Sequence, residues 1–203
     1  MPVTVRSLGH RFPDGPWLFQ NVDLDLRPGR SYAVTGPSGS GKSTLLGILA
    51  GWTAPARGTV EVDVPGRVSW VFQNPHGAPR RTARDHVAWP LLATGLRPAD
   101  ADARAQQLLD RVGLAAHANR PFALLSGGEA QRLMLARGIA ARPGLFLVDE
   151  PTAQLDRSRA HDVNTALSQL TDPGTVLVLA THDEQTRRSC TDHVDLTGYG
   201  ATL

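Results

Sequence analysis

A glycine-rich stretch at residues 36–44 constrains this chain more than any other feature of its sequence. It fits the spacing G-x-x-x-x-G-K-[ST], and its residues are Gly36-Pro37-Ser38-Gly39-Ser40-Gly41-Lys42-Ser43-Thr44. Glycines let consecutive backbone N–H groups converge on phosphate oxygens, and a following helix adds its positive N-terminal end. We expect Lys42 to reach the terminal phosphates and the Ser43 hydroxyl to ligate Mg²⁺. By itself, this stretch predicts a nucleoside triphosphate site.

The residues on either side of this stretch support that prediction. Residues 31–35 form an apolar run typical of a buried strand, and residues 44–50 have the spacing of a helix. A flexible Gly/Ser turn with an incidental lysine is the simpler interpretation. Such a turn would not require a strand before it and a helix after it, so we expect the loop to bind a nucleotide.

Composition and charge narrow the class of protein. A chain of 203 residues can bury one sizeable core, and its formal net charge of +2 gives no argument for a nucleic-acid partner. Cys190 is the single cysteine, so no internal disulfide can form. The N-terminus has no apolar run of signal-peptide length, and the longest apolar runs are strand-sized. We expect an intracellular protein whose membrane part, if one is needed, belongs to another chain.

The hydrophobic pattern divides the chain into strand-rich and helix-rich parts. Apolar and polar side chains alternate, as in half-buried antiparallel strands, at residues 3–5, 22–26 and 59–64. Residues 67–72 alternate less and predict a central strand, whereas residues 84–138 are rich in Ala, Leu, Arg and Asp and predict helices. Continuous apolar runs, typical of parallel strands covered on both faces, occur at residues 145–149 and 175–181. The pattern predicts an α/β core interrupted by a helical insertion.

Polar side chains suited to catalysis follow the predicted strands. In parallel α/β sheets, ligands lie at the carboxyl ends of the strands. Asp149 and Glu150 follow such a strand. Asp149 is therefore placed to hold Mg²⁺, and Glu150 to polarise a water aimed at the γ-phosphate. His182 ends the next apolar run, where its imidazole can contact the γ-phosphate or that water. Gln73 follows another strand, and its neutral amide can ligate Mg²⁺ or water. Taken alone, each residue would be ordinary at the end of a strand.

A second glycine pair marks the start of another predicted helix. Ser126 is a good N-cap residue, and Glu129, three residues later, completes a capping box. An ordinary capped helix explains those two residues but not Gly127 and Gly128, because glycines in the first turn destabilise a helix. Glycines at a helix N-terminus leave backbone N–H groups open to an anion. This segment therefore predicts a second phosphate-binding surface.

Together these motifs resemble the ATPase subunits of ATP-binding cassette (ABC) transporters over nearly the whole chain. They follow the family's order: phosphate loop, glutamine loop, signature segment with Glu129 in place of the commoner glutamine, carboxylate pair and histidine. The resemblance implies an α/β P-loop NTPase with a RecA-like parallel sheet, an N-terminal antiparallel β subdomain and an inserted helical subdomain. It implies a single ABC ATPase domain over residues 1–203, with the core at 1–76 and 139–203 and the helical signature subdomain at 77–138.

The resemblance also implies how these residues act together. Two copies would pack head to tail, each ATP lying between the phosphate loop of one copy and the signature segment of the other. Phe12 stands where the family stacks an aromatic ring on adenine, and Asp156 falls on the loop that crosses the dimer interface. The implied catalytic residues are Glu150, His182 and Gln73. The implied Mg²⁺ ligands are Ser43, Gln73 and Asp149, and the implied nucleotide contacts are Phe12, residues 36–44, Ser126, Gly127, Gly128, Glu129 and Asp156.

The implied partners are a second cassette and a separate transmembrane permease subunit, with the chain in the cytoplasm against the inner face of the membrane. Residues 85–92 and the compact insertion resemble the lipoprotein-release, macrolide-efflux and cell-division branch. The alternative is a soluble cassette ATPase acting on DNA or ribosomes, which would carry a long coiled-coil insertion or two cassettes. A small-molecule P-loop kinase would not need the signature segment. A neighbouring reading frame that encodes membrane spans would favour the transporter.

Overall fold

The computed structural model describes residues 2–152, 155, 157–170 and 172–200. The chain forms two compact units. The first comprises Met1–Trp70, Gly144–Glu150 and Asp172–Leu203, and the second comprises Val71–Pro143 and Pro151–Thr171. The expected division into core segments at 1–76 and 139–203 around a helical subdomain at 77–138 stays a prediction.

An antiparallel sheet in the first unit has the order β2-β1-β4. Its strands are β1 (Val3–Arg11), β2 (Trp17–Leu26) and β4 (Arg57–Val62). Val5 pairs with Leu24 on one side and with Val60 on the other. Alternate residues of a strand share one face, and the inward-facing Val3 and Val5 are fully buried. The predicted antiparallel strands are therefore confirmed.

A second sheet of the first unit has the order β5-β6-β7-β3-β8. Its strands are β5 (Arg67–Val71), β6 (Pro143–Asp149), β7 (Val176–Ala180), β3 (Ser31–Thr35) and β8 (Asp192–Asp195). The pairs β6–β7, β7–β3 and β3–β8 are parallel, and every residue of β6 is buried. This placement confirms the parallel core but shows that the central position predicted for residues 67–72 was wrong. The strand β5 lies at the edge, and its residues Arg67 and Val68 are exposed.

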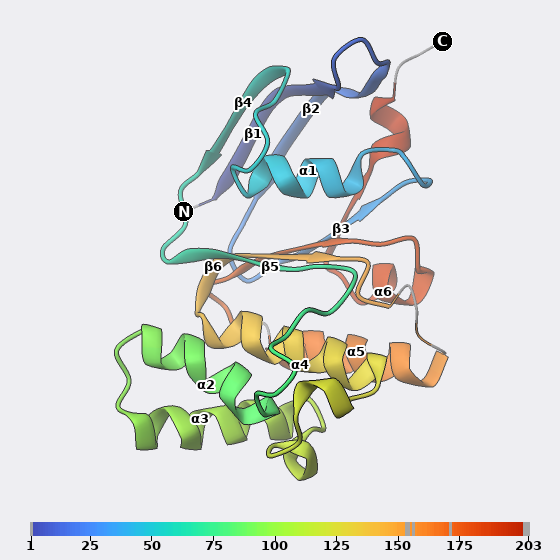
Figure 1. Ribbon diagram of the computed structural model, residues 1–203. Coiled ribbons are helices and arrows are strands. Elements are labelled where there is room, and N and C mark those ends of the chain that lie inside the picture. The colour runs from blue at the N-terminus through green and yellow to red at the C-terminus, as the bar shows by residue number, and fades with distance from the viewer. Residues whose placement is uncertain (1, 153–154, 156, 171, 201–203) are drawn as a thin grey trace. The chain divides into compact units, whose positions relative to one another are not determined.

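Helix α1 (Lys42–Leu49) lies between the two sheets of the first unit (Figure 1). Its buried residues Leu45, Leu46 and Leu49 join one apolar cluster with residues of both sheets. The short helices α6 (Glu184–Arg188) and η3 (Leu196–Tyr199) complete this unit. The sandwiched helix holds the phosphate loop at a rigid position, because its apolar side chains are packed from two directions.

The second unit is helical, as the composition of residues 84–138 predicts. Its elements are α2 (Ala83–Ala93), α3 (Pro98–Arg111), η1 (Ala115–His117), η2 (Phe122–Leu124), α4 (Gly127–Ala140) and α5 (Arg157–Leu170). Pro98 stands in the first turn of α3, where its missing N–H costs nothing. Leu91, Leu108, Leu109 and Leu133 are buried and form part of its core. No helix in the described part of the chain is long and apolar enough to span a membrane.

Candidate nucleotide site

The phosphate loop joins β3 to α1, and its conformation depends on Gly41. This residue is the N-cap of α1, has a φ of 92°, and provides no side-chain cap. A Cβ at this position would lie 2.9 Å from two ring atoms of Phe19. Both the left-handed backbone and the close approach of Phe19 exclude a larger residue. No side chain therefore caps the start of α1, and its backbone N–H groups are open to an anion.

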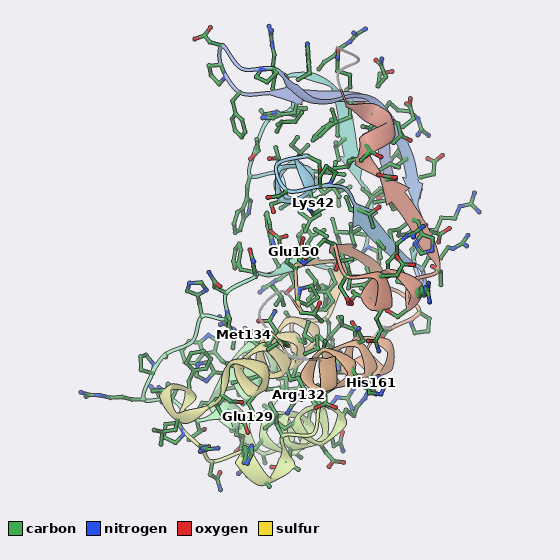
Figure 2. The ribbon with its side chains drawn as sticks, turned by 90° about the vertical axis from the view of Figure 1, so that its right-hand side faces the viewer. Lys42, Glu129, Arg132, Met134, Glu150 and His161 are labelled. Atoms are coloured by element: carbon green, nitrogen blue, oxygen red, sulfur yellow. The ribbon has the colours of Figure 1, made fainter. Side chains whose placement is uncertain are left out.

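Lys42 is bound within the loop that precedes it. Its Nζ donates hydrogen bonds to the carbonyl oxygens of Gly36 at 2.9 Å and Pro37 at 3.3 Å. The same Nζ lies 3.6 Å from Oε1 of Glu150, and Figure 2 shows the two side chains beside each other. Lys42 is only 8% exposed, so its charge is balanced by this local set of oxygens. Sequence reasoning did not foresee the ion pair with Glu150, which joins residues 108 positions apart.

Glu150 is held from a second side by His182. Nδ1 of His182 lies 2.8 Å from Oε2 of Glu150, and the backbone N–H of His182 donates to the same oxygen at 3.3 Å. Glu150 has a φ of 44°, and its own N–H donates to the carbonyl of Ala180. A positive φ in a glutamate is uncommon and is found where surrounding contacts hold the backbone. The carboxylate is therefore fixed between a lysine and a histidine.

Asp149 lies next to Glu150 and is 8% exposed. Burial raises the pKa of Asp149 above its ordinary 3.8, and the nearby charge of Glu150 raises it further, against a hydrogen bond with Ser43 and the charge of Lys42. Among the described residues, its Oδ1 is buried without a hydrogen-bond partner. A carboxylate oxygen and a hydroxyl are the ligand types Mg²⁺ takes from a protein, the rest coming from phosphates and water. Ser43 and the unpaired Oδ1 thus fit a magnesium ion.

The signature segment begins α4 in the second unit. The Ser126 hydroxyl accepts from the Glu129 N–H at 3.3 Å, and Oε2 of Glu129 accepts from the Ser126 N–H at 2.7 Å, so the predicted capping box is present. Apart from the neighbouring residues and the backbone of α4, no described heavy atom lies within 4 Å of the Cβ position of Gly127. Packing among the described residues therefore does not require a glycine there.

Glu129 has additional partners that the sequence did not indicate. Nδ1 of His117 lies 3.1 Å from its Oε1, and Nη1 of Arg120 lies 3.8 Å from its Oε2. Burial alone would raise the pKa of Glu129, but the Ser126 hydrogen bonds and these two charges outweigh it, so the pKa is lowered. Glu129 therefore remains an anion fixed at the start of α4, shown with its side chain in Figure 2.

The structure brings together one part of the predicted site. Lys42, Ser43, Asp149, Glu150 and His182 form a connected polar cluster in the first unit. Phe12 also belongs to this unit, follows the last residue of β1 and is 55% exposed. Gln73 and Ser126–Glu129 belong to the second unit, and Asp156 lies outside the described residues. The binding and catalytic roles of all these residues stay predictions.

Comparison with protein families matches residues 19–153 to the family described as ABC transporter. The lipoprotein-releasing system ATP-binding protein LolD of Bordetella pertussis is 39% identical over 202 residues, covering 90% of this chain and 87% of that protein. LolD of Alcanivorax borkumensis is 35% identical over 195 residues, covering 88% and 86%. These two relatives carry the likeness along most of both chains.

Solved structures agree with this likeness. An ATP-binding cassette dimer in a post-hydrolysis state, bound to ADP and Pi, superposes with a TM-score of 0.80 at 27% identity, covering 95% of this chain and 93% of that one. A dimeric bacterial ABC transporter cassette superposes with a TM-score of 0.81 at 26% identity, covering 96% and 94%. The α/β P-loop NTPase fold is thereby confirmed.

Proposed function

Since the chain belongs to the ABC transporter family, we propose that it powers a separate membrane-embedded subunit through ATP-driven dimerisation. It is an ATP-binding ATPase of that family. The observation that carries the proposal is the carboxylate of Glu150, held between Lys42 and His182 at the phosphate loop. A fixed carboxylate beside a phosphate loop is suited to orienting water for phosphoryl transfer.

The contacts of Glu150 support an order of events in which Lys42 first pairs with Glu150 and then with the phosphates of ATP. Lys42 balances the charge of Glu150 and the carbonyls of its own loop. Phosphate oxygens, which carry more negative charge, would attract the Lys42 ammonium more strongly. That exchange leaves Oε1 of Glu150 to accept a proton from water, while His182 keeps Oε2 in place. ATP binding would thus release Glu150 from Lys42, so that Glu150 can act as the general base.

The magnesium that such an ATPase uses would be held by Ser43 and Asp149, because the buried Oδ1 of Asp149 has no hydrogen-bond partner in the described part of the chain. When bound, the ion neutralises charge on the transferred phosphoryl group. Gln73 is the third proposed ligand, and it belongs to the second unit. The ion would also remove the penalty of burying Asp149 as an anion.

The open surface at Gly127 supports a shared site between two copies. The helix start of α4 is stabilised by Ser126 and Glu129, yet a Cβ at Gly127 would meet no described atom within 4 Å beyond its neighbours and its own helix backbone. A γ-phosphate held by another copy could approach this backbone closely. We place Asp156, outside the described residues, on the loop that crosses between the copies.

A cavity of about 520 Å³ in the second unit is our proposed contact for the membrane partner. It is lined by the apolar residues Trp89 and Leu92 and by charged residues of both signs, Arg81, Asp85, Asp102 and Arg137. Trp89 and Leu92 are exposed, which fits an apolar segment bordered by polar groups. Through this partner the protein would be held in the cytoplasm at the inner face of the membrane. Trp89→Asp should uncouple ATP hydrolysis from the membrane subunit and leave ATP binding unchanged.

The test of the shared site uses Glu150→Gln, which keeps shape but removes the carboxylate that orients water. This variant should bind ATP without turnover and change from monomer to dimer on ATP addition, measured by light scattering. Adding Ser126→Arg should abolish the dimer, because a long side chain cannot fit where phosphate approaches the backbone. Gln107→Arg, which adds the same side chain at an exposed position of α3, is the matched control and should leave the dimer intact.

A Glu150→Gln protein that stays monomeric at saturating ATP, both alone and with its membrane partner, would contradict the shared site. A dimer that survives Ser126→Arg would contradict the role of the signature segment. Either result leaves the phosphate loop assignment to be judged by ATP binding alone.

A further inference from the structure

One buried imidazole in the first unit has no role in the proposed site. His10 lies on β1, is 6% exposed, and neither of its ring nitrogens has a hydrogen-bond partner among the described residues. A neutral imidazole always carries one N–H donor and one acceptor, and burying both unpaired costs folding free energy. An apolar ring would fill the same space without that cost. The contacts that His10 makes among the described residues are therefore those of its ring.

The ring contacts of His10 connect the two ends of the nucleotide site. Its ring lies edge-on to Phe12, with centroids 5.2 Å apart and planes at 88°. On its other side it lies near Phe19, with centroids 6.5 Å apart and planes at 34°. Phe19 is the residue whose ring excludes a side chain at Gly41 in the phosphate loop. Three aromatic rings thus extend from the phosphate loop to Phe12.

Phe12 needs such a support if it stacks on a base. It follows β1 directly and is more than half exposed. An exposed side chain that must adopt one rotamer for stacking loses conformational freedom on binding, and this loss weakens affinity. The ring of Phe12 is in direct edge-on contact with the ring of His10. An edge-on aromatic contact restricts the ring before the nucleotide arrives.

We propose that His10 is a positioning residue for base recognition: its ring, packed on Phe19, holds Phe12 in the orientation that stacks on the nucleotide base. This inference rests on the proposed role of Phe12. The ring of His10 supplies the contact and its nitrogens do not, because neither nitrogen has a hydrogen-bond partner among the residues that the structure describes. His10 therefore acts on the affinity for the base through Phe12.

The test is a double-mutant cycle on the whole chain, with the ATP dissociation constant measured by calorimetry. Phe12→Ala should weaken ATP binding by about five- to 150-fold, as the loss of one stacking contact predicts. His10→Leu fills the buried space but removes the ring, and should weaken binding by about two- to tenfold. His10→Phe keeps a ring and should retain the affinity of the unmodified protein. In the Phe12→Ala background, His10→Leu should have no further effect.

A matched control separates this role from general loosening of the sheet. Val5→Ala creates a cavity elsewhere on β1, at a fully buried residue. It should lower the melting temperature more than His10→Leu does, without changing ATP affinity. Melting temperatures of all variants verify that each is folded.

Each contrary outcome has a distinct meaning. An equal loss from His10→Leu in both backgrounds, or a failure of His10→Phe to retain affinity, overturns the proposal. Unchanged affinity in His10→Leu overturns it as well. Unchanged affinity in Phe12→Ala shows instead that the base platform itself is misassigned, and the inference about His10 then falls with it.

Discussion

The helices α1 and α4 both have a glycine at or next to their first residue, but they begin in opposite ways. Helix α1 has Gly41 as its N-cap, with no side chain to cap its first N–H groups. Helix α4 has Ser126, which forms a complete capping box with Glu129. The first helix therefore leaves its N–H groups for a ligand, whereas the second is already stabilised by its own residues.

The glycines at these two starts are required for different reasons. Gly41 has a left-handed backbone, and Phe19 occupies the space where a side chain would go. Gly127 has open space around it among the described residues. The fold itself demands the first glycine. Packing among the described residues does not explain the second, and we propose that it leaves room for a phosphate held by another copy.

The largest expected effect is the loss of ATP binding in Lys42→Ala. The variant removes the charge that we propose to contact the phosphates, so affinity should fall by about 100-fold or more. Calorimetric titration of ATP measures it. Arg30→Ala removes an exposed cation of the same unit that pairs with Asp192, and should bind ATP normally.

Chemical labelling of Lys42 tests its proposed contact with the phosphates in a second way. Lys42 is the only lysine in the chain. Pyridoxal phosphate followed by borohydride should therefore modify one side chain, and ATP should protect it, as peptide mass spectrometry can establish. Unchanged ATP affinity in Lys42→Ala, or labelling of Lys42 that ATP does not slow, would contradict the phosphate loop assignment.

Next comes a pair of matched glycine substitutions that tests the comparison directly. Gly41→Ala should destabilise the fold by about 2 kcal/mol or more, because an L-residue is strained at this φ and its Cβ meets Phe19. Gly127→Ala should stabilise the fold by up to about 1 kcal/mol, since alanine favours a helix. Urea unfolding measures both. Equal losses of stability in the two variants would show that the start of α4 is as constrained as that of α1.

A smaller effect is expected from Ser126→Ala. The variant removes the hydroxyl that accepts from the Glu129 N–H, and loss of an N-cap costs about 1 kcal/mol. Thermal unfolding should show a lower melting temperature, and Ser126→Asp, which can also cap, should restore it. If Ser126→Ala unfolds at the original temperature, the capping box does not stabilise α4.

The smallest expected effect is a pH-dependent gain of stability in Asp149→Asn. Burial raises the folded-state pKa of Asp149 above 3.8, so the folded chain keeps a proton that the unfolded chain loses first. The stabilising contribution of this group is full below pH 3.8 and is lost as pH rises through the folded-state pKa. The uncharged variant should therefore gain stability over the original protein as pH rises through that window.

Urea unfolding at a series of pH values measures this difference, with the exposed change Asp110→Asn as the comparison. A constant difference between Asp149→Asn and the original protein across the series would contradict the raised pKa.

Local features of this protein could be predicted from the sequence because they depend on neighbouring residues. The spacing of residues 36–44 requires a loop between a strand and a helix, and Ser126 with Glu129 requires a capped helix start. The alternation at residues 3–5 gave a half-buried strand, since the period of two follows from backbone geometry alone. These are properties of short segments, and a sequence displays them directly.

Only the tertiary structure decided which distant segments meet. The pairing of Lys42 with Glu150, the edge position of β5 and the burial of His10 against Phe12 and Phe19 all depend on strand order and on packing between segments. A short strand pattern without clear alternation occurs in central strands and in edge strands, so the pattern at residues 67–72 could not place β5 at the edge. The sequence determined that a phosphate loop and its carboxylates exist, whereas packing determined which charges balance them, because contacts between distant residues leave no local periodicity.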